Sequence, residues 1–287
     1  MLKQFAQGPQ PVLDTDADLK SSLIDLSNEK LTWPEKSAIM TFARESLNVK
    51  PQFEDVWYRS ACWGYYAARL IEIFILSGLE SKACELLDKD SDWSVFDQAL
   101  SQGKGAVMLM AHLGPGRIPA YAASRRGHDV KQIVKFRVPK SKENVENYIF
   151  VESEAEMKTS LIKALKHLKS GGVIAAAGTG RYGGHHLVAN FLGNELPVFL
   201  GISELAQLSG SPAFWVTSSW TDADRLQLII EPIPRPNAEG DEWHKQFLGA
   251  YFQKLARHMK KHPADLGFNR GFWNPGEGLP WYKSKVT

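Results

Sequence analysis

The feature that most constrains the fold is a series of short apolar runs, each ending in a loop rich in glycine or basic residues. Three such runs have strand length: residues 106–110, 130–136 and 173–177. Helical patterns separate them, and in residues 152–169 the apolar side chains recur on one face. This alternation predicts an α/β fold with a mostly parallel central sheet flanked by helices.

The rest of the chain is predicted to add strands at residues 214–218 and 226–230 and a closing helix at residues 242–260. Before residue 96 the pattern is helical, with a loose tail at residues 1–15. We therefore predict two parts. Residues 1–95 form an N-terminal helical segment that packs on the core, and residues 96–287 form the α/β domain.

Residues 54–88 read as one or two helices rich in Trp, Tyr and Ile, and they allow two interpretations. They form either a helix that covers the core or an interfacial helix that touches lipid. We favour the first, because no dense basic face opposes the apolar one. The most apolar stretch, residues 56–79, is interrupted by Arg59, Arg69 and Glu72. We expect no transmembrane segment and at most peripheral membrane contact.

The net charge and the cysteine content argue against a nucleic-acid-binding protein and against a disulfide-stabilised one. The net charge is +2, from 34 basic and 32 acidic residues, so the chain as a whole has no drive toward nucleic acid. Its two cysteines, Cys62 and Cys84, lie in apolar helical stretches, where buried reduced thiols are usual. With no signal peptide evident, we expect a cytoplasmic protein.

Three loops follow predicted strands and would meet at the carboxyl edge of the sheet, where α/β proteins carry their functional groups. They span residues 111–117, the stretch containing Arg137, and residues 177–186. A neutral imidazole directly after a buried strand, as at His112, can act as a general base toward a hydroxyl or amine. The alternative for His112 is a structural histidine at a strand end.

The stretch from Gly103 to Gly114, with a strand ending in His112-Leu-Gly, resembles the lipid A late acyltransferases, the lauroyl/myristoyl acyltransferases. Residues 191–212 and 255–263 resemble later blocks of that family, in the same order. The resemblance implies a lysophospholipid-acyltransferase-like fold and a catalytic His112. It also implies an acyl donor in the form of a carrier-protein thioester.

The sequence departs from this family at its acidic positions. Where the family has Asp or Glu after four intervening residues, this chain has Arg117, which cannot accept an imidazole N–H. The acid that begins the second block is replaced by Gly178-Thr179-Gly180. The family's N-terminal membrane helix is also missing. Either His186 or Glu204 is a candidate to orient His112 in place of the lost acid.

Several residues of the three loops are candidates for binding substrate. Arg117 would hold an anion together with a helix N-terminus, or it is simply exposed. Arg137 matches a basic position of the family. The substrate-binding candidates are Arg117, Arg137, Arg181, Gly178, Gly180 and His185. No carboxylate or cysteine completes a metal site with His185 and His186, so we expect neither metal nor cofactor.

The sequence thus predicts an enzyme, an acyltransferase. It would move an acyl group from a carrier-protein or CoA thioester to an amine or hydroxyl, on a soluble natural-product intermediate rather than lipid A. The acceptor class is a small molecule or lipid. The alternative is a non-catalytic relative that binds an acyl chain or a carrier protein. The two differ in whether a partner group hydrogen-bonds the second nitrogen of His112.

Overall fold

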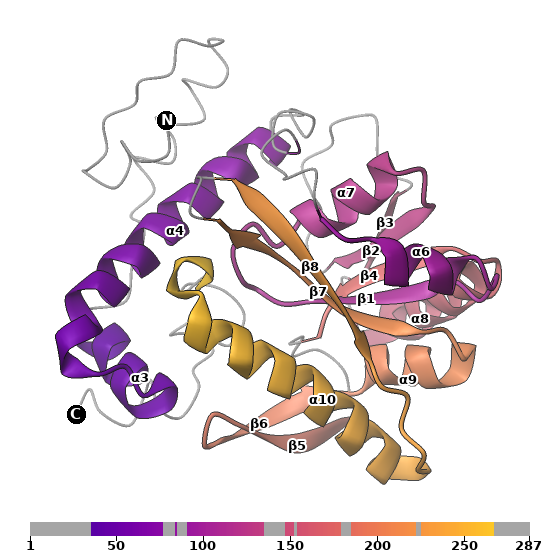
Figure 1. The fold of residues 1–287 in the computed structure, drawn as a ribbon. Helices are drawn as coiled ribbons and strands as arrows, with labels where there is room; N and C mark the ends of the chain where they lie inside the picture. Colours follow the sequence, from indigo (N-terminus) through magenta and orange to yellow (C-terminus); the bar gives the residue numbers. More distant parts are fainter. Residues whose placement is uncertain are drawn as a thin grey trace.

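The computed structural model describes residues 36–76, 84, 91–134, 147–151, 154–178, 185–221 and 225–266. Within them the predicted fold class is confirmed: a six-stranded sheet, parallel except for its last strand, is flanked by helices (Figure 1). The strand order is β3-β2-β4-β1-β7-β8. The strands are β1 (Ala106–Met110), β2 (Val130–Val134), β3 (Tyr148–Phe150), β4 (Val173–Ala177), β7 (Ala213–Trp220) and β8 (Leu226–Ile233).

Helices cover both faces of this sheet, and a separate antiparallel hairpin lies beneath α10 (Figure 1). The helices are α3 (Lys36–Leu47), α4 (Glu54–Leu76), α6 (Ser94–Leu100), α7 (Ile118–Arg125), α8 (Glu154–Lys169), α9 (Gly201–Ser209) and α10 (Gly240–Lys261). The hairpin strands are β5 (His186–Phe191) and β6 (Asn194–Phe199), and single 3-10 turns stand at η1 (Pro51–Phe53) and η3 (Pro263–Asp265).

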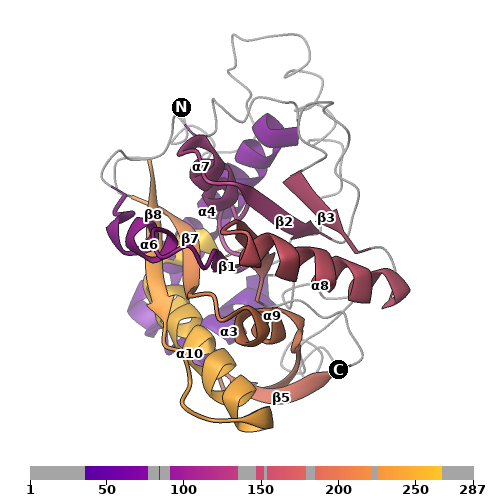
Figure 2. The same ribbon diagram turned by 90° about the vertical axis from the view of Figure 1, so that its right-hand side faces the viewer.

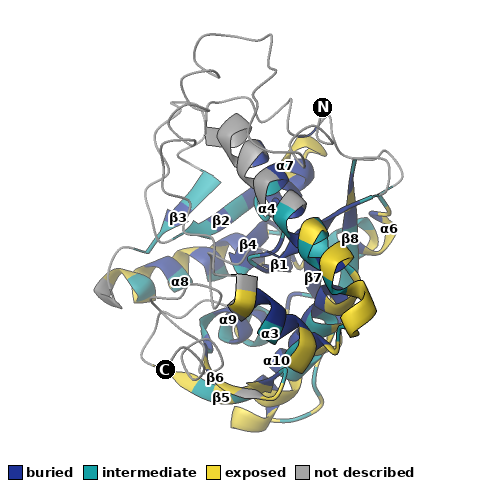
Figure 3. Cartoon of the chain, turned by 90° about the vertical axis from the view of Figure 1, so that its left-hand side faces the viewer, coloured by how far each residue is buried: buried dark blue, intermediate teal, exposed yellow. Residues whose placement is uncertain are grey.

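The side chains of β1 alternate between two hydrophobic cores, as those of a strand buried on both faces must. Val107 and Leu109 belong to a core shared with α3, α8, α9 and α10. Met108 and Met110 belong to a second core shared with α6 and α7. Figure 3 shows the central strands in dark blue, with exposed residues on the outer helices and on the β5–β6 hairpin. Because β1 is packed on both faces, the position of its carboxyl end is fixed.

The observed elements differ from the predicted ones mainly at the edges. β2 is described from Val130 to Val134, and residues 135–136 of the predicted strand lie outside the described residues; β7 is longer than predicted. The hairpin β5–β6 was not predicted, although its turn has a clear signature. Leu192 and Gly193 both have positive φ, 52° and 79°, as two-residue hairpin turns require. β3 was also missed, because three residues carry too little pattern to mark a strand.

The described N-terminal helices pack on the sheet's own cores. Ile39 and Phe42 of α3 lie in the first core, and Ala67 and Ile71 of α4 lie in the second. The division of the chain at residue 95 stays a prediction. Among the described residues, no helix is long and apolar enough to cross a membrane.

Candidate functional site

The connections that leave β1 and β4 diverge at the carboxyl edge of the sheet. From β1 the chain runs through α7, on the second core, to β2. From β4 it runs through the hairpin and α9, on the first core, to β7 on the far side of β1. Figure 2 shows α7 and α9 on opposite sides of β1. Open α/β sheets commonly bind their ligands beyond the carboxyl ends of two strands whose connections diverge in this way.

The carboxyl ends of β1 and β4 are held together by hydrogen bonds. The Gly178 N–H donates to the carbonyl oxygen of Met110 at 2.9 Å, and the Tyr251 hydroxyl donates to the same oxygen at 3.0 Å. A Cβ at Gly178 would lie 2.7 Å from the Tyr251 ring. Glycine is therefore required here for packing, and its amide is already engaged within the protein. This is a different role from the ligand contact predicted for Gly178.

His112 stands just beyond β1 and is half-buried. The turn that follows it is held at each residue. Leu113 forms an isolated antiparallel bridge with Leu266, and the Gly114 N–H donates to the Asp265 carbonyl oxygen at 2.5 Å. The Pro115 carbonyl oxygen accepts from the Ser218 hydroxyl at 3.1 Å. The position of His112 thus depends on contacts with β7 and η3, far away in sequence.

Arg117 lies immediately before α7, at its N-cap position, as the sequence analysis placed it near a helix N-terminus. A cation there opposes the helix dipole. The residue is half-buried, and its Nη1 atom is buried without a hydrogen-bond partner in the described structure. Because a buried N–H group is costly when it is left unpaired, this atom marks a place that would suit an anion.

The remaining predicted residues are separated by the structure. Arg137, Gly180 and Arg181 lie outside the described residues. His185 is exposed, and its Nδ1 atom lies 3.2 Å from a carboxylate oxygen of Glu204. His186 is in β5, with its ring 5.7 Å from that of Phe199.

Glu204 is thus engaged with His185, another of the candidate residues. Whether Glu204 or His186 orients His112 stays a prediction. The described residues include no cluster of three or more His, Cys, Asp or Glu side chains that could hold a metal ion.

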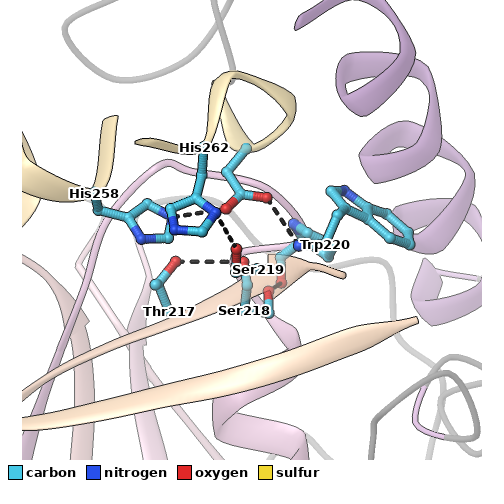
Figure 4. A network of polar contacts seen from close by, with 8 residues as sticks. Thr217, Ser218, Ser219, Trp220, His258 and His262 are labelled. Carbon is cyan, nitrogen blue, oxygen red and sulfur yellow. Dashed lines mark hydrogen bonds and ion pairs between the residues drawn. The ribbon is translucent and has the colours of Figure 1, made fainter. Parts of the chain in front are cut away.

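A polar cluster beside the His112 turn was missed by the sequence analysis. His258 Nε2 lies 2.6 Å from Asp265 Oδ2, and the His258 ring stacks on that of His262 at 4.4 Å (Figure 4). His262 Nδ1 in turn lies 3.2 Å from the Ser219 hydroxyl. A signal exists in the spacing: His258, His262 and Asp265 are four and three residues apart, which places them on one side of a helix end.

In this cluster, the surroundings of His262 shift its pKa downward. Burial lowers the pKa of His262, and the adjacent His258 lowers it further, while Asp265 acts in the opposite sense. The structure therefore favours a neutral His262 imidazole.

No protein-family model matches the chain, and no curated protein matches it. The likeness to the lipid A late acyltransferases rests on the residues quoted above. The structure adds the α/β fold and the place of His112 at the end of β1.

Proposed function

We propose that this chain is an acyltransferase in which His112 acts as the general base. It would move an acyl group from a carrier-protein or CoA thioester to an amine or hydroxyl of a soluble acceptor. One observation carries the proposal: a half-buried histidine stands two residues beyond β1, at the carboxyl edge of the sheet where the β1 and β4 connections diverge to opposite faces. The resemblance of residues 103–114 to the acyltransferase motif supports the same assignment.

The proposed reaction needs one base and no redox partner. His112 removes the proton from the acceptor hydroxyl or amine as its oxygen or nitrogen attacks the thioester carbonyl carbon. The C–S bond then breaks, and the thiolate takes a proton from the His112 imidazolium. The products are the acylated acceptor and the free thiol of the carrier protein or CoA.

Arg117 fits this scheme as an anion-binding residue. CoA and acyl carrier protein both present their thioester on a phosphate-bearing pantetheine arm. The buried Nη1 atom of Arg117 has no partner in the described structure, and it stands at the N-terminal end of α7, where an anion is favoured. We assign Arg117 to the anionic part of the donor. Arg137 and Arg181, which lie outside the described residues, are proposed to assist it.

The proposed location is the cytoplasm. Cys62 and Cys84 are both thiols in the structure, which suits a reducing compartment. The proposed partners are an acyl carrier protein or acyl-CoA as donor and a small molecule or lipid as acceptor, with no nucleic acid.

The test is release of free thiol from acyl-CoA and acyl-carrier-protein thioesters, measured with a thiol reagent in the presence of amine and hydroxyl acceptors. A positioned general base contributes about 10²–10⁴-fold to rate, so His112→Ala should lower kcat by that factor and leave donor binding nearly intact. His128→Gln is the matched control, because His128 precedes β2 at the opposite edge of the sheet, where it contacts Asp97.

Full turnover in a folded His112→Ala variant would end this mechanism. The alternative, a non-catalytic binder of acyl chains or carrier protein, predicts a different result. Donor thioesters would bind without releasing thiol, and His112→Ala would leave their affinity unchanged.

A further inference from the structure

The segment that follows α10 is wedged between α4 and the His112 turn. A Cβ placed on Gly64 of α4 would lie 1.6 Å from the Ala264 carbonyl oxygen, so the two backbones touch directly. On its other side, the Asp265 carbonyl oxygen of η3 accepts from the Gly114 N–H, and Leu266, the residue after η3, forms the isolated bridge with Leu113. Because of this close packing, η3 cannot shift without moving the turn after His112.

Asp265 is the residue of η3 where these contacts converge, and it is only 1% exposed. Its Oδ2 atom contacts His258 Nε2 at 2.6 Å, and its Oδ1 atom accepts from the Trp220 N–H at 3.1 Å. Its backbone carbonyl oxygen accepts from the Gly114 N–H. One residue therefore connects α10, β7 and the His112 turn.

The buried carboxyl group determines where that carbonyl oxygen lies. A carboxyl group out of water is tolerated only when donors satisfy its oxygens, so Asp265 is held where His258 and the Trp220 amide can both reach it. Glycine at position 114 allows the backbone to come this close to Ser218 and Asp265. Its φ of 49° suits glycine, and a Cβ there would lie 3.0 Å from the Ser218 carbonyl oxygen and 3.6 Å from Asp265 Oδ1.

We propose that Asp265 is a positioning residue for His112. Held by His258 and the Trp220 amide, it fixes the Gly114 backbone and so the direction in which the chain leaves β1 with the His112 side chain. The inference rests on the proposed function for its kinetic consequence. Asp265 and its partner His258 are 1% and 4% exposed, so Asp265 acts through the backbone and does not contact substrate.

The first test is hydrogen exchange of the Gly114 amide, which needs no substrate. Asp265→Ala should raise the exchange rate of this amide about 10- to 100-fold. The variant loses the carboxyl contacts to His258 and the Trp220 N–H, which hold the Asp265 carbonyl oxygen where the Gly114 N–H reaches it. The β1 amides serve as an internal reference and should keep their protection. Glu231→Gln is the matched control: it removes ion pairs to Lys254 and Arg257 of α10, away from the turn.

The second test is kinetic, on the thioester substrate that the parent turns over. Asp265→Ala should lower kcat about 10- to 100-fold and leave the KM for the donor within about threefold, because it misplaces the base without touching the donor. Asp265→Asn should recover part of kcat, since an amide oxygen still accepts from the Trp220 N–H. If Asp265→Ala does not fold, Asp265→Asn and His258→Gln take its place in both tests.

The outcomes separate this inference from the proposed function. If the parent turns over no thioester, the acyltransferase proposal fails, and the exchange test still decides whether Asp265 holds the turn. Unchanged Gly114 exchange in a folded Asp265→Ala or His258→Gln variant overturns the inference even in an active acyltransferase. So does raised exchange with the kcat of the parent.

Discussion

Replacing Arg117 by methionine should stabilise the protein in the absence of ligand, which is unusual for the loss of a half-buried charged residue. The buried Nη1 atom has no partner in the described structure, and an unpaired buried N–H costs about 1–3 kcal/mol. A cation beside the first turn of α7 adds about 0.3–1 kcal/mol of unfavourable dipole energy. Methionine keeps most of the apolar stem and removes both costs.

The net gain expected for Arg117→Met is about 1–2 kcal/mol, after allowing for imperfect packing of the new side chain. This corresponds to a rise in Tm of roughly 2–6 °C for a chain of this size. Urea unfolding followed by circular dichroism measures it directly. Arg125→Met is the control, because Arg125 is exposed in the last turn of the same helix, where a cation is favourable. That variant should lose up to about 1 kcal/mol.

Ligand should stabilise the parent more than Arg117→Met. CoA at about 100 times its Kd would stabilise the parent by about 2.7 kcal/mol. Loss of a charge-assisted hydrogen bond should weaken CoA binding to Arg117→Met by roughly one to two decades, so the same CoA concentration stabilises that variant by only about 0.4–1.4 kcal/mol. Arg125→Met should keep the full CoA effect. An Arg117→Met protein that is less stable than the parent and is stabilised equally by CoA would refute the anion-site argument.

Two further predictions concern packing and protonation. Gly178→Ala should lower the free energy of unfolding by about 1–3 kcal/mol, because its Cβ would lie 2.7 Å from the buried Tyr251 ring. Urea unfolding measures this beside a Gly249→Ala control, in which nothing lies within 4 Å of the new Cβ. An unchanged urea midpoint for Gly178→Ala would contradict the prediction. For His262, burial holds the folded pKa below its ordinary value of 6.5. Between the folded pKa and pH 6.5, the unfolded chain therefore binds more protons than the folded chain. Stability should therefore fall as pH drops below about 7 and level off beneath the folded pKa. His262→Gln should reduce that acid slope, and an identical slope in the variant would show that another group causes it.

Local patterns in the chain were enough to predict the main-sheet strands β1, β2, β4, β7 and β8 and the helices α8 and α10, but not β3 or the β5–β6 hairpin. The three buried apolar runs appear as β1, β2 and β4, and the one-sided helix at residues 152–169 appears as α8. The place of His112 beyond the end of a central strand also followed from such a run, because a parallel strand buried on both faces must be apolar throughout. The β5–β6 hairpin was missed although its residues alternate between exposed and more buried positions, because the exposed Val188 and the Pro197 within β6 hide that alternation in the sequence.

Which side chains meet at the strand ends was decided only by the tertiary structure. Asp265 is far from Gly114 in the chain, and no local pattern states that η3 will pack against the turn after β1. The buried Nη1 atom of Arg117, which has no hydrogen-bond partner in the described structure, likewise could not be predicted from the sequence. Whether a single atom is buried depends on which neighbouring elements pack over it. The sequence by itself determined the main-sheet strands except β3, the helices α8 and α10, and the candidate base His112. The tertiary structure determined what holds His112 in place, because hydrogen-bond partners distant in the chain are brought together only when the cores on the two faces of the sheet are packed.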